Sequence, residues 1–121
     1  MMKNLNILVV DDSRIARMVV RGILEQINPD FVIGEASSGR EADVHLENGT
    51  WDMMILDHSM PGETGLDYAA RLKDRQLALD IFILTANIQH EMKAKAGELG
   101  VGFIEKPPTE EKLRAIFNGL D

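Results

Sequence analysis

The stretch that decides the fold is MMILDHSMPG, residues 53–62. Four apolar residues lead directly into the carboxylate of Asp57, and the turn-forming pair Pro61-Gly62 follows within a few positions. A short apolar run bounded by turn residues is typical of a strand that is buried on both faces. Asp57 would then lie at the carboxyl end of the strand, where open α/β sheets bind their ligands. A single aspartate after a strand is more often a turn former, so its role depends on what surrounds it.

Four further apolar runs of strand length occur in the chain, at residues 5–10, 31–33, 81–84 and 101–104. Each strand is followed by a segment whose apolar residues recur at helical spacing. In the first of these segments Ser13 is the expected N-cap, and the apolar positions are Ile15, Met18, Val19, Ile23 and Ile27. Strands that alternate with helices favour a parallel sheet with helices on both faces. The sequence therefore predicts a doubly wound α/β fold with five strands and five helices.

Length and composition limit the classes of function that the chain can have. A chain of 121 residues suits one domain over residues 1–121. The net charge of −7 argues against direct nucleic-acid binding, because phosphate neutralisation requires a basic surface. No apolar run is long enough for membrane insertion, and the absence of cysteine fits a cytoplasmic protein without thiol chemistry. The histidines, His45, His58 and His90, lack metal-ligand spacing and are expected to face solvent.

Polar or small residues follow four of the predicted strands: Asp11 and Asp12, Asp57, Thr85 with Ala86, and Lys106. The carboxyl ends of parallel strands meet at one edge of a sheet, so we expect these side chains to converge. Taken singly, each has a plain structural explanation as a cap, a turn residue or a solvated charge. A cluster of carboxylates repels itself, however, and either raises carboxylate pKa values or recruits a cation. Such an all-oxygen site suits Mg²⁺, which binds through one or two carboxylates plus phosphate oxygens.

These groups are suited to phosphoryl transfer. A carboxylate such as Asp57 can attack phosphorus and form an aspartyl phosphate. A divalent cation, the ammonium of Lys106 and the hydroxyl of Thr85 would stabilise charge on the transferred oxygens. Ala86 matters because it is small, since a large side chain at that position would obstruct the phosphoryl group.

Four motifs occur in order: Asp11-Asp12-Ser13, LDHSMPG at residues 56–62, Leu84-Thr85-Ala86 and Lys106-Pro107. In this combination the chain resembles the receiver domain of two-component response regulators, and in particular the stand-alone chemotaxis regulators. The resemblance covers residues 5–120. It implies a flavodoxin-like sheet of strand order 2-1-3-4-5, a cytoplasmic signalling protein rather than an enzyme, and a single receiver domain without an output domain.

The resemblance also implies a role for each residue of the acidic cluster. Asp57 would be the phosphoacceptor. Asp12, Asp57 and the backbone carbonyl of Ser59 would bind Mg²⁺ or Mn²⁺ directly, and Asp11 would act through water. Lys106 would pair with the phosphoryl group.

A second group of residues is implied to transmit or tune the signal. The switch residues would be Thr85 and Phe103, and the bond between Lys106 and Pro107 would be cis. Phosphoryl access and lifetime would depend on Ala86, Ser59 and Asn87. The chain departs from the family pattern at Phe103, which lacks the hydroxyl of the chemotaxis regulator's tyrosine, and at Pro108, which replaces a frequent phenylalanine.

The implied partners are a histidine kinase or histidine phosphotransfer protein, and an unknown downstream protein that docks on the fourth helix, fifth strand and fifth helix. One alternative is a Mg²⁺-dependent phosphatase of the haloacid-dehalogenase type. It requires an Asp-x-Asp pattern after the first strand, whereas Asp11 and Asp12 are adjacent; turnover of a phosphomonoester would favour it. The other is a flavodoxin-like cofactor module, whose phosphate loop is rich in glycine or hydroxyls rather than doubly acidic.

Overall fold

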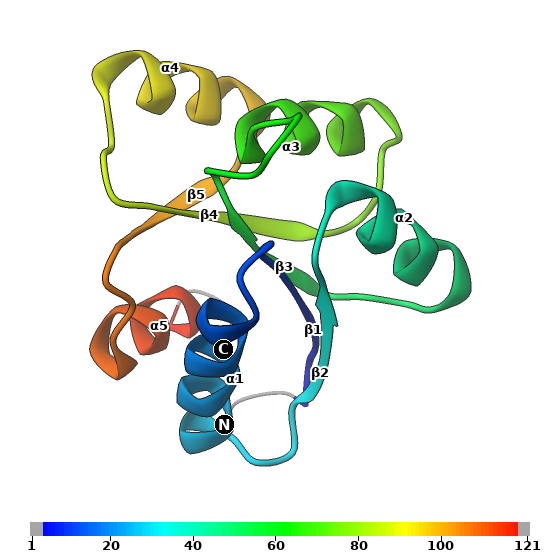
Figure 1. Ribbon diagram of the computed structural model, residues 1–121, viewed down its shortest axis with the longest axis vertical. Coiled ribbons are helices and arrows are strands. Elements are labelled where there is room, and N and C mark those ends of the chain that lie inside the picture. Colours follow the sequence, from blue (N-terminus) through cyan, green and yellow to red (C-terminus); the bar gives the residue numbers. More distant parts are fainter. Residues whose placement is uncertain (1–3, 119–121) are drawn as a thin grey trace.

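The computed structural model describes residues 4–118. The ends of the range predicted for the domain, 1–121, and residue 120, where the family resemblance ends, lie outside it. Strands and helices alternate along the chain (Figure 1). The strands are β1 (Asn6–Val10), β2 (Val32–Ala36), β3 (Met53–Asp57), β4 (Asp80–Thr85) and β5 (Gly102–Glu105). The helices are α1 (Arg14–Ile27), α2 (Gly39–Asn48), α3 (Gly65–Asp74), α4 (His90–Leu99) and α5 (Glu110–Phe117).

The strands form one sheet in which every pairing is parallel and the order is β2-β1-β3-β4-β5. The predicted doubly wound α/β fold and its strand order are confirmed. Strand β3, the centre of the sheet, is buried at every position, as its continuous apolar run predicts. Asp57 is therefore the last residue of the most enclosed strand.

Helices cover both faces of the sheet (Figure 1). Alternate residues of β3 point to opposite faces, so Met54 and Leu56 pack with α2, α3 and α4, whereas Met53 and Ile55 pack with α1 and α5. Buried Leu24 and Phe117 belong to the second of these cores. The two apolar layers fix β3 from both sides and so hold its carboxyl end in place.

Side-chain caps set the start of most helices. Hydroxyls of Ser13, Ser38, Thr64 and Thr109 accept hydrogen bonds from backbone N–H groups three residues later. The predicted cap at Ser13 is confirmed. Helix α4 has no side-chain cap at Gln89 and ends at Gly100, whose φ of 71° lies in the left-handed region that glycine adopts readily.

Two predictions about the first half of the chain are wrong in detail. The second strand runs from Val32 to Ala36 rather than over residues 31–33, because Phe31 leaves the sheet and stacks on Phe117 at 5.1 Å between ring centroids. In α1 the helix packs through Val20 and Leu24, which lie one turn apart. Ile23 and Ile27 are partly buried against the same core. Ile15, Met18 and Val19 are exposed instead, by 74%, 58% and 47%.

Candidate functional site

The register of the sheet brings the predicted site together. Val9 pairs with Ile55, so the residues two positions further on, Asp11 and Asp57, lie on the same side of neighbouring strands. Asp57 pairs in turn with Leu84, and Leu84 with Ile104, two residues before Lys106. Asp11, Asp57 and Lys106 therefore project from the ends of β1, β3 and β5 toward the α1 and α5 side.

The three carboxylates form a compact cluster. Oxygens of Asp11, Asp12 and Asp57 all lie within 4.8 Å of one another. Asp11 and Asp57 are only 4% and 3% exposed, while Asp12 faces solvent. Burying two like charges side by side is unfavourable unless a cation compensates them.

Lys106 supplies part of that compensation. Its Nζ lies 2.8 Å from Oδ1 of Asp57, and its side chain is 33% exposed. The contact is an ion pair without the direction of a hydrogen bond, and within residues 4–118 Oδ1 of Asp57 has no hydrogen-bonding partner. A buried carboxylate oxygen without a directed donor, beside two further carboxylates, fits a hard divalent cation such as Mg²⁺.

The pKa of Asp11 is raised above its ordinary value. Burial is the largest cause, because it disfavours the charged carboxylate, and the nearby charge of Asp57 adds to it. The hydrogen bond that the backbone N–H of Ser13 donates to Oδ1 of Asp11, at 2.9 Å, works in the opposite direction. The pKa of Asp11 is thus raised mainly because the carboxyl is buried, and the neighbouring carboxylates add to that effect.

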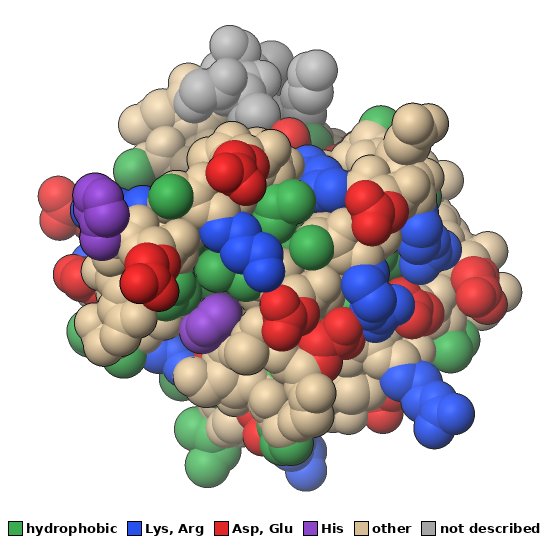
Figure 2. Space-filling model, turned by 90° about the horizontal axis from the view of Figure 1, so that it is seen from above, with side chains coloured by type: hydrophobic (Ala, Val, Ile, Leu, Met, Phe, Trp, Pro, Cys, Tyr) green, Lys and Arg blue, Asp and Glu red, His purple; other side chains and the backbone are tan. Residues whose placement is uncertain are grey.

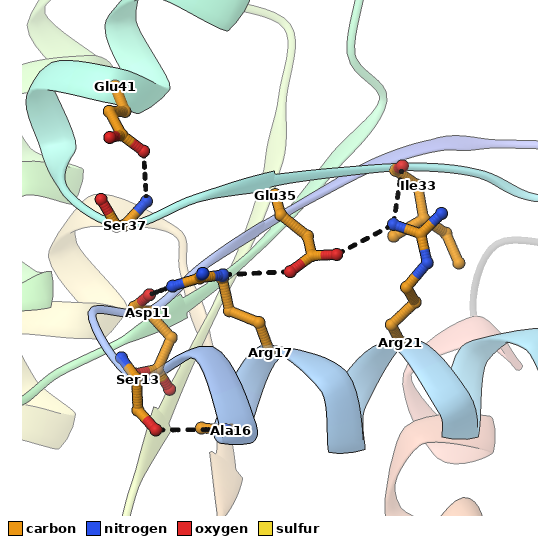
Figure 3. Close-up of polar contacts among 9 residues, drawn as sticks. All are labelled: Asp11, Ser13, Ala16, Arg17, Arg21, Ile33, Glu35, Ser37 and Glu41. Atoms are coloured by element: carbon orange, nitrogen blue, oxygen red, sulfur yellow. Dashed lines mark hydrogen bonds and ion pairs between the residues drawn. The ribbon is translucent and has the colours of Figure 1, made fainter.

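An arginine-based network at this edge was not predicted from the sequence. Arg17 reaches from α1 to the backbone carbonyl of Asp11 and to Glu35, which also binds Arg21 (Figure 3). The apolar spacing of α1 predicts its helical character but gives these arginines no role. A usable signal was present, since Arg17 and Arg21 are spaced i,i+4 and Glu35 stands near the end of a strand.

Thr85 and Phe103 share the opposite side of the sheet. Ile83 pairs with Phe103 and belongs to the core under α2, α3 and α4, as does the half-buried Phe103. Thr85 follows Ile83 by two residues and is buried; its Oγ1 accepts a hydrogen bond from the N–H of Asn87 at 3.3 Å. The predicted switch residues thus lie on one face of the sheet, on the neighbouring strands β4 and β5.

The remaining predicted residues lie on the loops around the cluster. Ser59, Ala86 and Asn87 are exposed. The bond between Lys106 and Pro107 is cis, the geometry that the family resemblance implies. Nζ of Lys112 donates to the carbonyl of Pro107 at 3.0 Å, which ties this loop to α5.

Two of the three histidines differ from expectation. His45 is half-buried against Trp51, with ring centroids 5.8 Å apart, and His58 is also half-buried. Nδ1 of His58 is enclosed and has no hydrogen-bonding partner in the described part of the chain. His45 lies within α2, where Nε1 of Trp51 also donates to its backbone carbonyl at 2.9 Å, and His58 directly follows β3. His90 is exposed as predicted.

An apolar groove of about 450 Å³ opens beside the cluster. Its lining includes Val19 and Val20 of α1 on one side and Pro107 and Pro108 on the other, and it reaches Asp11 and Lys106. Val19, one of the exposed apolar side chains of α1, belongs to this lining. The groove thus provides an apolar approach to an otherwise charged site.

The outer surface is mixed in charge. On the face in Figure 2, acidic and basic side chains are interspersed and form no continuous basic patch. Across residues 4–118, no helix combines the length and apolar character needed to cross a lipid bilayer.

Comparison with known proteins identifies the family. The sequence profile of the response regulator receiver domain matches residues 7–118. The chain belongs to this family. Chemotaxis protein CheY-3 of Vibrio cholerae is 34% identical to this receiver domain over 125 residues, which cover 98% of the chain and 95% of the relative. Response regulator UvrY of Escherichia coli is 30% identical over 120 residues, and the receiver domain spans about half (55%) of its length.

Solved structures agree with this assignment. Vibrio cholerae CheY4 superimposes on the receiver domain with a TM-score of 0.87 at 25% identity, covering 98% of this chain and all of the other. The isolated receiver domain of RcsB from Salmonella enterica, determined in the presence of the phosphomimetic BeF₃⁻, gives a TM-score of 0.84 at 25% identity, with 98% and 88% coverage. The matches do not support the phosphatase alternative.

Proposed function

We propose that this receiver domain accepts a phosphoryl group on Asp57 from a histidine kinase or histidine phosphotransfer protein, in a reaction that requires Mg²⁺ or Mn²⁺. The observation that carries the proposal is the buried Asp57 carboxylate, ion-paired with Lys106 at 2.8 Å and grouped with two further carboxylates. A carboxylate held in this way is accessible to a phosphoryl group only from the open edge of the sheet.

In the proposed step an oxygen of Asp57 forms a bond to phosphorus while the P–N bond of a phosphohistidine breaks. The electron pair of that bond leaves with the imidazole nitrogen, which takes up a proton from water. The Lys106 ammonium then turns from the carboxylate to the phosphoryl oxygens, because these carry more negative charge. Ala86, being small and exposed, leaves room for the group.

The metal ligands in this proposal are Asp12, Asp57 and the backbone carbonyl of Ser59, with Asp11 acting through water. When bound, Mg²⁺ supplies positive charge that neutralises the carboxylates and the transferring oxygens. The burial of Asp11 beside Asp57 supports this assignment, since a bound cation would offset the two like charges. Ser59 and Asn87 stand at the mouth of the site, where they would control access of water to the acyl phosphate.

The donor would approach along the apolar groove. A phosphohistidine has to reach Asp57, so the protein that carries it has to contact the rim of the site. The rim is polar toward Asp11 and Lys106 but apolar toward Val19 and Pro108. The exposed Val19 would add apolar area that excludes water from the transfer.

The signal would leave through the opposite face of the sheet. The hydroxyl of Thr85 now accepts from Asn87, and a phosphoryl group on Asp57 would offer it an acceptor instead. Movement of Thr85 would change the space beside Phe103 and so favour one of two packings of α4, β5 and α5. A downstream protein would read that packing.

The test is incubation with Mg²⁺ and a small acyl phosphate, followed by intact mass measurement. We expect a gain of one phosphoryl group that disappears in Asp57→Asn and after removal of the metal with a chelator. Asp74→Asn, which alters an exposed carboxylate at the end of α3, is the matched control and should still be phosphorylated. Phosphorylation that persists in Asp57→Asn would overturn the site, and steady turnover of a phosphomonoester would favour a phosphatase.

A further inference from the structure

We infer that Arg17 is a positioning residue of the acidic site: it orients the peptide that joins Asp11 to Asp12 and thereby sets where the Asp12 carboxylate points. The inference rests on the metal-binding part of the proposed function. It concerns a residue of α1 whose side chain does not touch Asp57 or the phosphoryl group.

The contacts of Arg17 are short and enclosed. Its Nη1 donates to the backbone carbonyl of Asp11 at 2.6 Å, and its Nε donates to Oε1 of Glu35 at 3.0 Å (Figure 3). Only 15% of the side chain is exposed. Glu35 is fixed in turn by Nη1 of Arg21, which donates to its Oε2 at 3.0 Å. Three elements, α1, β1 and β2, therefore meet at one guanidinium.

The Asp11 carbonyl is a sensitive point of contact. The N–H of Asp11 already donates to the carbonyl of Ala36 at 3.0 Å, and its carboxylate accepts from the N–H of Ser13. The carbonyl belongs to the same planar peptide as the N–H of Asp12, so holding it fixes the direction in which the chain leaves β1. The Asp12 carboxylate is exposed and belongs to the cluster, and it is carried there by the backbone that leaves β1. Its direction thus depends on the backbone.

The arrangement also explains why the Arg17 guanidinium can lie beside the acidic cluster without neutralising its charge. Arg17 contacts a carbonyl of the acidic loop rather than a carboxylate, and its charge is balanced by Glu35. The cluster therefore keeps its negative charge for a metal. A guanidinium can donate in two directions from one rigid plane, whereas the single ammonium of lysine is a point donor on a flexible stem.

The experiment measures Mn²⁺ affinity of the full chain by electron paramagnetic resonance, without any phosphodonor. Loss of groups that orient metal ligands typically weakens affinity 10- to 100-fold. We expect a loss of about tenfold or more in Arg17→Met, and an intermediate loss in Arg17→Lys.

Arg21→Met is the matched control, since Arg21 contacts Glu35 and the carbonyl of Ile33 but not Asp11. It should bind Mn²⁺ within about twofold of the wild type, a smaller loss than that typical of groups that orient ligands. At saturating metal the phosphorylation rate of Arg17→Met should recover.

Unchanged Mn²⁺ affinity in folded Arg17→Met, or an equal loss in Arg21→Met, would overturn the inference. If Arg17→Met does not fold, the decision passes to Arg17→Lys, whose unchanged affinity would be equally decisive. Failure of the proposed function looks different: the wild type would then bind Mn²⁺, lose it in Asp12→Asn, and never gain a phosphoryl group. A wild type that binds no Mn²⁺ contradicts the positioning role itself.

Discussion

Nζ of Lys106 lies 2.8 Å from Oδ1 of Asp57, so a partly exposed lysine at the end of β5 faces a carboxylate that is almost fully buried in the centre of the sheet. The two residues are unequal partners. The lysine can turn to solvent, but the aspartate cannot. The buried charge of Asp57 therefore depends on Lys106 for compensation, whereas Lys106 does not depend on Asp57.

Lys106→Met should consequently destabilise the receiver domain. Removing one partner leaves the Asp57 carboxylate buried beside Asp11 and Asp12 without a cation, and we expect a loss of about 1–3 kcal/mol in the free energy of unfolding. Adding Asp57→Asn to Lys106→Met should recover most of it, because the unpaired charge is then gone. Urea unfolding without metal measures both. A Lys106→Met variant as stable as the wild type would mean that the ion pair contributes nothing.

The pH dependence of stability should report on Asp11. Its pKa in the folded protein is raised, chiefly by burial, so the folded state binds this proton more tightly than the unfolded state. The contribution of Asp11 to stability is therefore greatest below its unfolded pKa and is lost as pH rises through the raised folded pKa. Asp11→Asn, which keeps an oxygen for the N–H of Ser13, should stabilise the metal-free protein at pH 7 and much less under acidic conditions.

Urea unfolding at several pH values measures this difference. Asp74→Asn, at an exposed position, is the control and should change stability little at any pH. A stabilisation by Asp11→Asn that grows as pH falls would have the wrong sign and would contradict the burial argument.

The fold was predictable because its strands are buried on both faces. Such strands occur in the sequence as continuous apolar runs, for example residues 53–56. Edge strand β2 was misplaced because Gly34 and Glu35 interrupt its apolar pattern. Helical periodicity could not predict that Ile15 is exposed, since an apolar side chain at helical spacing can face either the core or a partner surface. The role of Arg17 depends on the backbone carbonyl of Asp11, and every residue has such an acceptor, so the sequence does not reveal which one is contacted.

Close packing at Gly65 supports the loop that follows Asp57. A Cβ at this position would lie 2.6 Å from the carbonyl oxygen of Asp57 and 2.9 Å from Cα of His58, both backbone atoms that cannot turn aside. Gly65→Ala should therefore cost about 1–3 kcal/mol of stability and displace Asp57. Gly22→Ala is the matched control, because a Cβ there meets nothing within 4 Å in α1.

In the control, alanine should raise helix stability by about 0.5–1 kcal/mol. Urea unfolding of the two variants should thus give changes of opposite sign. Equal stability of Gly65→Ala and the wild type would show that the start of α3 can move away from β3 without cost.

Thr85→Ala should separate phosphorylation from its readout. The hydroxyl lies beyond the register partner of Asp57 and shares a sheet face with Phe103, so its loss leaves the carboxylates and Lys106 in place but removes the group that would follow the phosphoryl oxygens. The variant should gain a phosphoryl group by intact mass, yet amide chemical shifts in α4 and β5 should move far less than in the wild type. Thr85→Ser retains the hydroxyl and should keep the shifts. Full shifts in Thr85→Ala would place the coupling in the backbone of the loop after β4 instead of in this side chain.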